Sequence, residues 1–326
     1  MSQDVWVVAE TLRGEVLEIT YTMLAAGRAL ADGRGGKLTA VLLGHNAEAL
    51  AGTLGLADGV TYVDHAALAD FTPEAYRQTI AGLVKGAAPR AVLLGHSSMG
   101  MDLVCGIGVE LGSPVVASCQ TLEAKAGKPR YVSVTCGGKV LAEGDLPAPT
   151  CLVTMVPGGY KPADGKKEGA PAIAKVAPPT ALDGLKVKLK GYIEPEAGDV
   201  DITKESVLAS VGRGIGQRDN LKLAEELAAA LGGAVSASRP VVDQGWLPTS
   251  RLVGKSGKSV KPRLYLALGI SGAPEHAEGM RDAECVVAVN TDEKAPIFDF
   301  AQYGATVDVL KLLPVLTAKI KQAKGS

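Results

Sequence analysis

Residues 206 to 216 read SVLASVGRGIG, and this stretch decides the fold of the second half of the chain. The run Ser206–Val211 has the length and apolar character of a buried strand. The glycines that follow allow a tight turn, and residues 219 to 231 then carry apolar side chains at helical spacing. A strand, a glycine turn and a helix in this order indicate a parallel α/β unit.

The glycine turn has two interpretations. Gly212, Gly214 and Gly216 let the backbone approach a phosphate closely, and the N-terminus of the next helix favours an anion. The spacing is not the dinucleotide fingerprint G-x-G-x-x-G, however, and no acidic residue stands at the expected place on a second strand. A tight turn without a ligand also explains these glycines.

The later strands of this half each end in polar or glycine residues. They are Ala234–Ala237 before Ser238-Arg239, Leu264–Ile270 before Ser271-Gly272, and Cys285–Val289 before Asn290. The segment from Val307 to Ile320 closes the pattern as a helix. The carboxyl ends of parallel strands meet at one edge of a sheet, which is where ligands bind in such folds.

The first half also alternates strands and helices. Short apolar strands are predicted at Val5–Ala9, Leu38–Leu43, Val60–Val63 and Ala91–Leu94, and helices at residues 15 to 31 and after Thr72-Pro73-Glu74. Strands that are apolar along their whole length indicate a sheet covered on both faces. The segments Arg130–Thr135, Lys139–Glu143 and Cys151–Val156 then predict shorter strands with little helix between them.

The chain is therefore expected to be an α/β protein of two domains, each a mostly parallel sheet with helices on both faces. Six of the 18 prolines lie between Pro157 and Pro195. This composition predicts domains over residues 1–157 and 196–326, joined by a linker or crossing segment over 158–195. A strand at Leu185–Tyr192 is the alternative, on either side of the boundary.

Composition excludes several classes of function. The net charge of −1 gives no basic surface for nucleic acid, and no apolar run is long enough to span a membrane. Five widely spaced cysteines without a C-x-x-C motif argue against a disulfide framework, a zinc site or an iron–sulfur cluster. The strand predicted at the very start leaves no room for a signal peptide, so an intracellular protein is expected.

Three further features follow the strands of the second half. Ser238-Arg239 offers a hydroxyl and a guanidinium, the run 253–257 (VGKSG) offers a cation and a hydroxyl, and the run 269–276 (GISGAPEH) ends a strand and begins a helix. Each has a structural explanation alone: a surface ion pair, a solvated loop, a helix cap or a core histidine. At one sheet edge, together, they predict a nucleotide or dinucleotide site.

The stretch from Val211 to Lys311 resembles the FAD domain of the electron transfer flavoprotein alpha subunit. The matching pieces are residues 211–215 (VGRGI), 237–243 (ASRPVVD), 254–258 (GKSGK), 269–273 (GISGA), 290–292 (NTD) and 295–298 (APIF). The first half resembles the nucleotide-hydrolase-like domain of the same family, mainly through residues 94–103 (LGHSSMGMDL).

The resemblance implies a Rossmann-like FAD-binding domain. It places Arg213, Ser238 and Arg239 at the flavin and pyrophosphate, Ser256 at the flavin N5, and His276 near the flavin O2. Asn290 and Asp308 would lie at the ribose and adenine end. The full set of implied cofactor-binding residues is Arg213, Ser238, Arg239, Val253, Gly254, Lys255, Ser256, Ser271, Gly272, Ala273, Pro274, Glu275, His276, Asn290, Asp308 and Val309.

The chain departs from the family pattern at several positions. The family usually has Gln at the positions of Lys255 and Glu275, Ile at Pro274, Asp at Gln302, and often Arg at Met101. We expect Lys255 and Glu275 to face each other and compensate in charge. If Lys255 alone reaches the ring, the flavin is easier to reduce than in relatives. His276 is expected to have a raised pKa, because a reduced, anionic flavin favours the imidazolium.

The resemblance implies an electron carrier that transforms no substrate alone. It would pair with a beta subunit that holds AMP or a second FAD, and pass electrons between a dehydrogenase of the acyl-CoA type and another oxidoreductase or quinone reductase. A bacterial or archaeal cytoplasm is expected, and a processed mitochondrial matrix form fits too. The alternatives are an NAD-dependent dehydrogenase and an adenine-nucleotide binding module without redox chemistry. The residues supply no complete NAD fingerprint for the former, and the latter leaves the loops at 253–256 and 271–276 unexplained.

Overall fold

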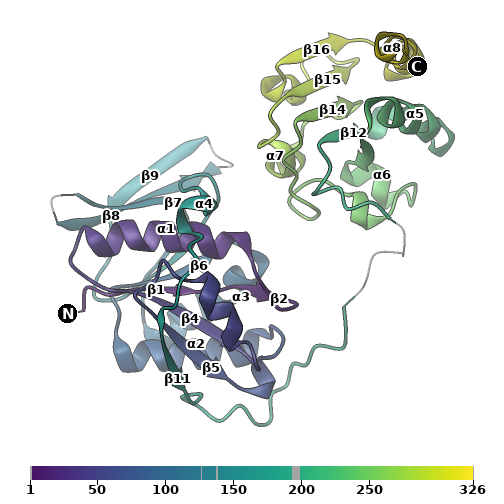
Figure 1. The fold of residues 1–326 in the computed structure, drawn as a ribbon. Coiled ribbons are helices and arrows are strands. Elements are labelled where there is room, and N and C mark those ends of the chain that lie inside the picture. Colours follow the sequence, from purple (N-terminus) through teal and green to yellow (C-terminus); the bar gives the residue numbers. More distant parts are fainter. Residues whose placement is uncertain (1, 126, 137–138, 193–198, 326) are drawn as a thin grey trace. The chain divides into compact units, whose positions relative to one another are not determined.

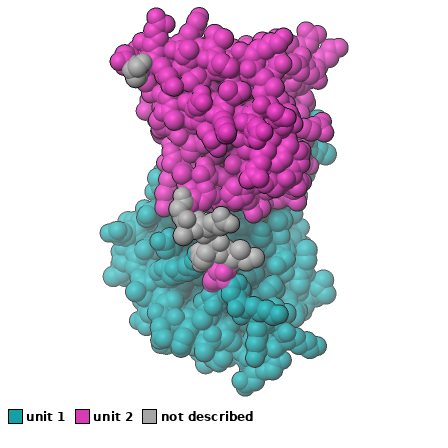
Figure 2. All heavy atoms as spheres, turned by 90° about the vertical axis from the view of Figure 1, so that its right-hand side faces the viewer, with its two compact units in different colours: residues 1–191 teal, residues 192–326 magenta. Residues whose placement is uncertain are grey.

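The computed structural model describes residues 2–125, 127–136, 139–192 and 199–325. The chain forms two compact units, one up to Gly191 and one from Tyr192 onward (Figures 1 and 2). Each unit has its own sheet and its own hydrophobic core. No helix in the described part of the chain is long and apolar enough to cross a membrane.

The first unit is built on a nine-stranded sheet (Figure 1). In spatial order its strands are β11 (Ala172–Val176), β5 (Gly59–Asp64), β4 (Leu38–Gly44), β1 (Val5–Val8), β6 (Ala91–Gly95), β10 (Cys151–Met155), β7 (Val115–Lys125), β8 (Lys128–Thr135) and β9 (Val140–Asp145). The strands from β11 to β7 run parallel, and β8 and β9 extend the sheet by antiparallel pairing. A small hairpin of β2 (Thr11–Leu12) and β3 (Glu15–Val16) follows β1.

Helices cover both faces of the parallel part of this sheet. Helix α1 (Glu18–Asp32) packs on one face, where its buried side chains meet those of β1, β4 and β10. Helices α2 (Pro73–Ala87) and α3 (Ser98–Leu111) pack on the other. The parallel strands are buried almost throughout, as expected for a sheet with helices on both sides. Shorter helical segments are η1 (Glu48–Thr53), η2 (Ala66–Leu68) and α4 (Pro162–Gly165).

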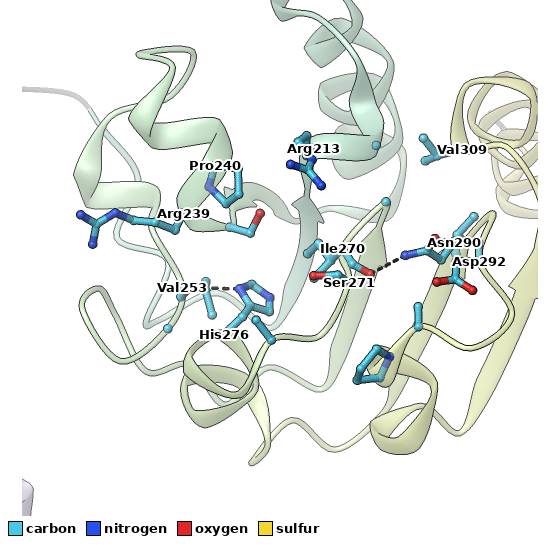
Figure 3. Close-up of a pocket in the computed structure, with 18 of the residues that line it drawn as sticks. Arg213, Arg239, Pro240, Val253, Ile270, Ser271, His276, Asn290, Asp292 and Val309 are labelled. Atoms are coloured by element: carbon cyan, nitrogen blue, oxygen red, sulfur yellow. Dashed lines mark hydrogen bonds between the residues drawn. The ribbon is translucent and has the colours of Figure 1, made fainter. Parts of the chain in front are cut away.

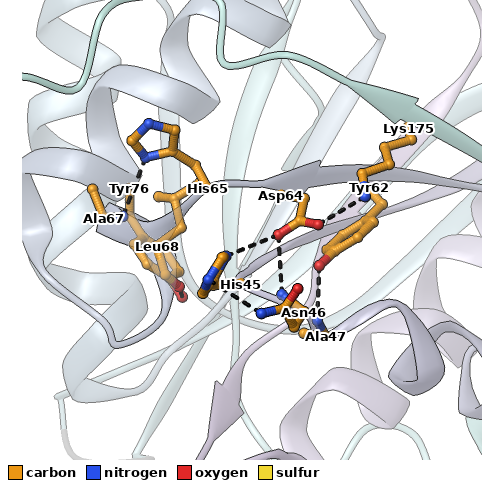
Figure 4. Close-up of polar contacts among 10 residues, drawn as sticks. All are labelled: His45, Asn46, Ala47, Tyr62, Asp64, His65, Ala67, Leu68, Tyr76 and Lys175. Carbon is orange, nitrogen blue, oxygen red and sulfur yellow. Dashed lines mark hydrogen bonds and ion pairs between the residues drawn. The ribbon is translucent and has the colours of Figure 1, made fainter.

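Part of the stretch expected to be a linker, 158–195, belongs to the first sheet. Strand β11 pairs in parallel with β5, although four of its five residues are exposed. Lys175 on β11 donates to Asp64 at 2.7 Å and lies over the ring of Tyr62 (Figure 4). His45 and the backbone amide of Asn46 contact the same carboxylate. The hydrogen bond from Lys175 is the main reason that the pKa of Asp64 is lowered. The described residues 185–192 form no strand.

The second unit is a parallel five-stranded sheet. Its spatial order is β13 (Ala234–Ala237), β12 (Val207–Val211), β14 (Leu264–Leu268), β15 (Val286–Asn290) and β16 (Tyr303–Thr306). In chain order this is 2-1-3-4-5, so the direction of winding reverses between β12 and β14. In open α/β sheets the crevice beyond the carboxyl ends of two such strands is the usual binding site.

Helices α5 (Leu221–Leu231) and α8 (Val309–Lys324) pack on one face of this sheet. Helix α7 (Pro274–Met280) and the short helix η7 (Pro296–Phe300) pack on the other. The short helices η4 (Arg213–Ile215), η5 (Arg218–Asn220), α6 (Arg239–Asp243) and η6 (Thr249–Arg251) lie in the connections. The expected α/β class, with parallel sheets covered by helices, is confirmed for both units.

Candidate cofactor site

A pocket of about 750 Å³ lies at the carboxyl edge of the second sheet (Figure 3). This volume is within the usual range of small-molecule and cofactor sites. Its lining comes from the segments that follow β12, β13, β14 and β15, and from the start of α8. The lining residues are Arg213, Gly214, Ser238, Arg239, Pro240, Leu252, Val253, Gly254, Lys255, Ser256, Gly269, Ile270, Ser271, Ala273, Glu275, His276, Val289, Asn290, Thr291, Asp292, Ala295, Pro296, Val307, Asp308 and Val309.

Glycines allow the segments after β12 and β14 to meet backbone to backbone at the point where the winding reverses. The amide of Gly214 donates to the carbonyl of Gly269 at 3.1 Å. A Cβ added to Gly212 would lie 2.3 Å from that same carbonyl oxygen, which is closer than real Cβ contacts come. Gly269 has a φ of +66°, a conformation that other residues rarely adopt. These contacts determine the shape of the crevice between the two strands.

Two cationic side chains stand beside the ends of β12 and β13. Arg213 is the first residue of η4, directly after β12. Arg239 opens α6, and the buried Ser238 precedes it. The guanidinium of Arg239 donates to Asp243 at 2.8 Å and to the hydroxyl of Ser256 at 2.9 Å. Arg239 thus connects helix α6 with the loop that contains Ser256.

The loop that contains Val253 and Ser256 is held by backbone contacts to α7 and to β13. Val253 donates to the carbonyl of Ala237 at 2.9 Å, and the amide of Lys255 donates to the carbonyl of Glu275 at 2.7 Å. Gly254 has a φ of +138°, and a Cβ there would lie 2.8 Å from the Glu275 carbonyl oxygen. Only glycine fits at this position, so the loop is closely packed at its base.

The expected pairing of Lys255 with Glu275 is wrong in this structure. The ammonium of Lys255 lies 3.9 Å from the carboxylate of Glu278, and both side chains are more than half exposed. Glu275 contacts Lys255 through its backbone carbonyl instead. Residues three apart on a helix lie on the same side of it, so α7 can present either carboxylate to this loop. The carboxylate that pairs with Lys255 is therefore that of Glu278.

His276 is buried between α7, β14 and the 253–256 loop. Its Nδ1 lies 3.1 Å from the carbonyl of Val253, and its Nε2 lies 2.9 Å from the hydroxyl of Tyr265 (Figure 3 shows the Val253 contact). Burial lowers the pKa of His276 to about 4, and the hydrogen bond to Val253 opposes this shift. The imidazole is therefore neutral near pH 7 in the protein alone.

The opposite end of the pocket is formed by polar side chains after β15 and by the start of α8. The amide of Asn290 donates to the carbonyl of Ile270 at 2.8 Å, and its oxygen accepts from the amide of Asp292 at 3.0 Å. Asp308 caps α8 by accepting from the amide of Leu310 at 2.9 Å. These contacts fix the loop conformation at this end of the pocket and leave the N-terminus of α8 facing it (Figure 3).

Most of the residues implied from the sequence line this pocket, and two do not. Gly272 and Pro274 are absent from the lining. Gly272 packs instead against η7, because a Cβ there would lie 2.2 Å from the amide nitrogen of Ile297. Lining residues that the sequence reasoning did not select include Ile270, Asp292 and Pro296. Ile270, Asp292 and Pro296 stand in the runs GISGA, NTD and APIF, so the resemblance itself contained the signal for all three.

The pocket residues fit FAD by their chemistry. Arg213, Arg239 and Lys255 supply positive charge, and guanidinium groups suit a pyrophosphate because their donors form a fixed fork. The N-terminus of the long helix α8 also faces the pocket, with the Asp308 carboxylate as its cap. Hydroxyls of Ser238, Ser256 and Ser271 complete a set of donors spread along the lining. No group of His, Cys, Asp and Glu suitable for a metal ion occurs within residues 2–125, 127–136, 139–192 and 199–325.

Comparison with known proteins points to one family. Residues 201–281 match the model of the electron transfer flavoprotein FAD-binding domain, and residues 5–181 match that of the electron transfer flavoprotein domain. An electron transfer flavoprotein subunit alpha of Thermoanaerobacterium thermosaccharolyticum is 35% identical over 99% of both chains.

Two further relatives are equally similar. The acryloyl-CoA reductase electron transfer subunit beta of Anaerotignum propionicum is 35% identical over 99% of this chain and 97% of its own. Protein FixB of Clostridium saccharobutylicum is 35% identical over 98% of this chain and 97% of its own. Matches of this extent include both units. The chain therefore belongs to the electron transfer flavoprotein alpha subunit family.

Proposed function

We propose that this chain binds FAD in the pocket of its second unit and carries electrons between two partner enzymes as the alpha subunit of a heterodimer. The observation that supports this most directly is the placement of Arg213, Arg239 and Lys255 around a pocket at the point where the sheet reverses its winding. Bound FAD would supply the one-electron and two-electron chemistry, so the protein needs no nucleophile or general base of its own.

The chain's own residues would bind and tune the cofactor. Gly214, Gly269 and Arg213 all line the pocket, so a pyrophosphate bound there would meet glycine backbone and a guanidinium group. Arg239 and Lys255 would place positive charge near the redox-active ring, where it favours the reduced, more negative state. The packed base of the 253–256 loop would keep the Ser256 hydroxyl at a fixed position, since Gly254 leaves it little freedom.

The partners are proposed from the family and from the names of the relatives. One relative is named as an electron transfer subunit of acryloyl-CoA reductase, which favours an acyl-CoA type dehydrogenase as a partner. The family normally forms a heterodimer with a beta subunit, and we propose such a partner here, with AMP or a second FAD bound to it. A quinone reductase or another oxidoreductase would be the second redox partner. We also propose a cytoplasmic location, as the relatives named above are bacterial.

The test is to produce the chain together with its beta subunit, denature the purified complex and identify the released nucleotides by chromatography. One FAD per alpha chain, and loss of it in the Arg213→Ala/Arg239→Ala double variant but not in Arg218→Ala, is the expected result. Arg218 is an exposed arginine of the same unit that does not line the pocket. A complex that releases no FAD contradicts the proposal. Tight binding of NAD or of AMP alone by a colourless alpha chain would support the dehydrogenase or the nucleotide-binding alternative.

A further inference from the structure

A chain of buried hydrogen bonds runs from His276 into the centre of the second sheet. Nε2 of His276 lies 2.9 Å from the hydroxyl of Tyr265, and that hydroxyl lies 2.7 Å from the hydroxyl of Ser210. Tyr265 and Ser210 have no exposed surface, and His276 is 6% exposed. The two hydroxyls stand on the neighbouring strands β14 and β12, while the imidazole lines the cofactor pocket.

The carbonyl of Val253 determines the tautomer of His276. A carbonyl oxygen only accepts hydrogen bonds, so Nδ1 at 3.1 Å must carry a hydrogen in every protonation state. The neutral imidazole then has a bare Nε2, which accepts from the hydroxyl of Tyr265. Because the single hydrogen of Tyr265 is used in this way, the Tyr265 oxygen is left to accept, and the hydroxyls of Ser210 and Ser236 can both donate to it.

A proton added to Nε2 reverses the donor and acceptor roles along this series of hydrogen bonds. Nε2–H then donates to the Tyr265 oxygen, and the Tyr265 hydroxyl turns to donate to Ser210 at 2.7 Å. Every heavy atom keeps its place, since only the two hydroxyl hydrogens rotate. A partner that only donates or only accepts suits one protonation state of Nε2 and opposes the other, whereas a hydroxyl suits both.

The charges around His276 determine when this reversal occurs. On α7 the nearby carboxylates are Glu275 and Glu278, and the facing loop carries Lys255. The pocket also holds the cations Arg213 and Arg239 and the anions Asp292 and Asp308, while β12 and β14 face the ring with Ser210 and Tyr265. In the protein alone burial dominates and His276 is neutral. Additional negative charge in the pocket favours the imidazolium.

We propose that Tyr265 is a positioning residue that enables His276 to take up a proton from solvent when an electron enters the cofactor pocket. The inference rests on the proposed function, because the electron arrives from the donor enzyme through bound FAD. The proton forms one new N–H bond at Nε2, and the added positive charge offsets the added negative charge. Tyr265 and Ser210 keep their own protons and exchange only donor and acceptor roles.

The first test uses the protein without cofactor. The chain has four histidines, so selective ¹⁵N labelling of the imidazoles gives few signals, and His276 can be identified by its absence in His276→Gln. Wild type should show hydrogen on Nδ1 at pH 7. At pH 4 the ratio of protonated to neutral His276 should fall about tenfold in Tyr265→Phe, because the imidazolium loses a stronger hydrogen bond than the neutral ring does. A rise in this ratio would mean that Tyr265 acts only as a donor, and would refute the proposal.

The second test compares the oxidised and dithionite-reduced FAD complex at one pH near 7. In wild type both ring nitrogens of His276 should become protonated on reduction, and the midpoint potential should depend on pH. In Tyr265→Phe the ring should stay neutral and this pH dependence should weaken, with FAD content unchanged. Tyr62→Phe removes a buried hydroxyl from the other unit and serves as the matched control. Unchanged signals of wild-type His276 on reduction would overturn the proposal.

Ser210→Ala provides the same test if Tyr265→Phe does not fold. It removes the group that receives the Tyr265 hydrogen in the protonated state, so it should shift the protonation ratio of His276 in the same direction. Ser236 also lies at the Tyr265 hydroxyl, so equal ratios in Ser210→Ala/Ser236→Ala and in wild type would contradict the relay. If the protein binds no FAD, the proposed function fails, whereas the titration without cofactor still decides whether the hydrogen bonds reverse.

Discussion

Gly214 and Gly269 lie so close that a Cβ added to either would be 2.7 Å from the Cα of the other. The first follows β12 and the second follows β14, the two strands between which the winding of the sheet reverses. Side chains at this point would separate the two segments and change the crevice where the pocket lies. Gly214 and Gly269 therefore shape the crevice by their contact with each other, in addition to any contact with a ligand.

Gly214→Ala should weaken FAD binding about fivefold or more. Overpacking of this kind costs about 1–3 kcal/mol, and the displaced backbone carries Arg213 with it. The measurement is the FAD content and the dissociation constant of the purified complex. Gly86→Ala is the control, because a Cβ at this helix position in the first unit meets open space. Equal affinity in Gly214→Ala and wild type would show that the contact does not shape the site.

Lys255→Gln and Glu278→Gln should shift the flavin midpoint potential in opposite directions. Removing the cation should make reduction harder, and removing its carboxylate partner at 3.9 Å should make reduction easier. Both side chains are exposed, so each effect should amount to less than about 1 kcal/mol. Potentiometry decides it, with Lys258→Gln as control because Lys258 lies in the same loop outside the pocket lining. Shifts of the same sign would rule out the pair as the source of the effect.

The second unit should lose stability as the pH falls from about 6.5 to 4 in the protein without cofactor. The pKa of His276 is about 4 when folded and 6.5 in the reference state, so the unfolded chain binds the proton first. Protonation therefore favours unfolding across this window, by a total on the order of 3 kcal/mol.

The pH dependence can be measured by denaturant unfolding that follows Trp246 in a Trp6→Phe background. His276→Gln should remove most of the slope between pH 6.5 and 4, whatever its effect at pH 7. His45→Gln changes a histidine of the first unit and should leave the slope intact. A slope that persists in His276→Gln would assign the pH dependence to other groups.

Lys175→Met should release strand β11 from the first sheet. The side chain joins β11 to Asp64 at 2.7 Å (Figure 4). Four of the five residues of the strand are exposed. Amides of residues 172–176 should exchange hydrogen faster, while the melting temperature of the unit changes little because these residues contribute little to the core. Lys188→Met, at an exposed position without such a contact, is the control. Unchanged exchange would show that backbone pairing with β5 suffices.

The sequence predicts those helices and strands whose buried face appears as a pattern of apolar side chains. The strand before Gly212 and helix α5 could be located to within one or two residues, because an apolar run and a helical period are independent signals. Strands β11 and β16 are largely exposed and were not predicted, since backbone pairing holds them in place and leaves no apolar pattern. For the same reason residues 158–195 were expected to form a linker or a crossing segment, and strand β11 within them was not predicted.

The candidate site was predictable as a set of residues and less so as a set of contacts. Most of the implied residues line the pocket because the ends of parallel strands must meet. The predicted partner of Lys255 was wrong. Which of Glu275 and Glu278 lies near the Lys255 ammonium depends on how α7 is packed, and the sequence does not show this. The contact of His276 with Tyr265 was not predicted, since Tyr265 lies within an apolar strand and carries no signal of its own.

Among the residues that the structure describes, those that line the pocket all come from positions 213–309, within the second unit. A single contiguous segment of the gene thus encodes the whole lining. Natural selection or an engineer could exchange this segment between relatives and transfer its redox properties with it. The first unit could meanwhile diverge in sequence under different constraints, without altering any residue that lines the pocket.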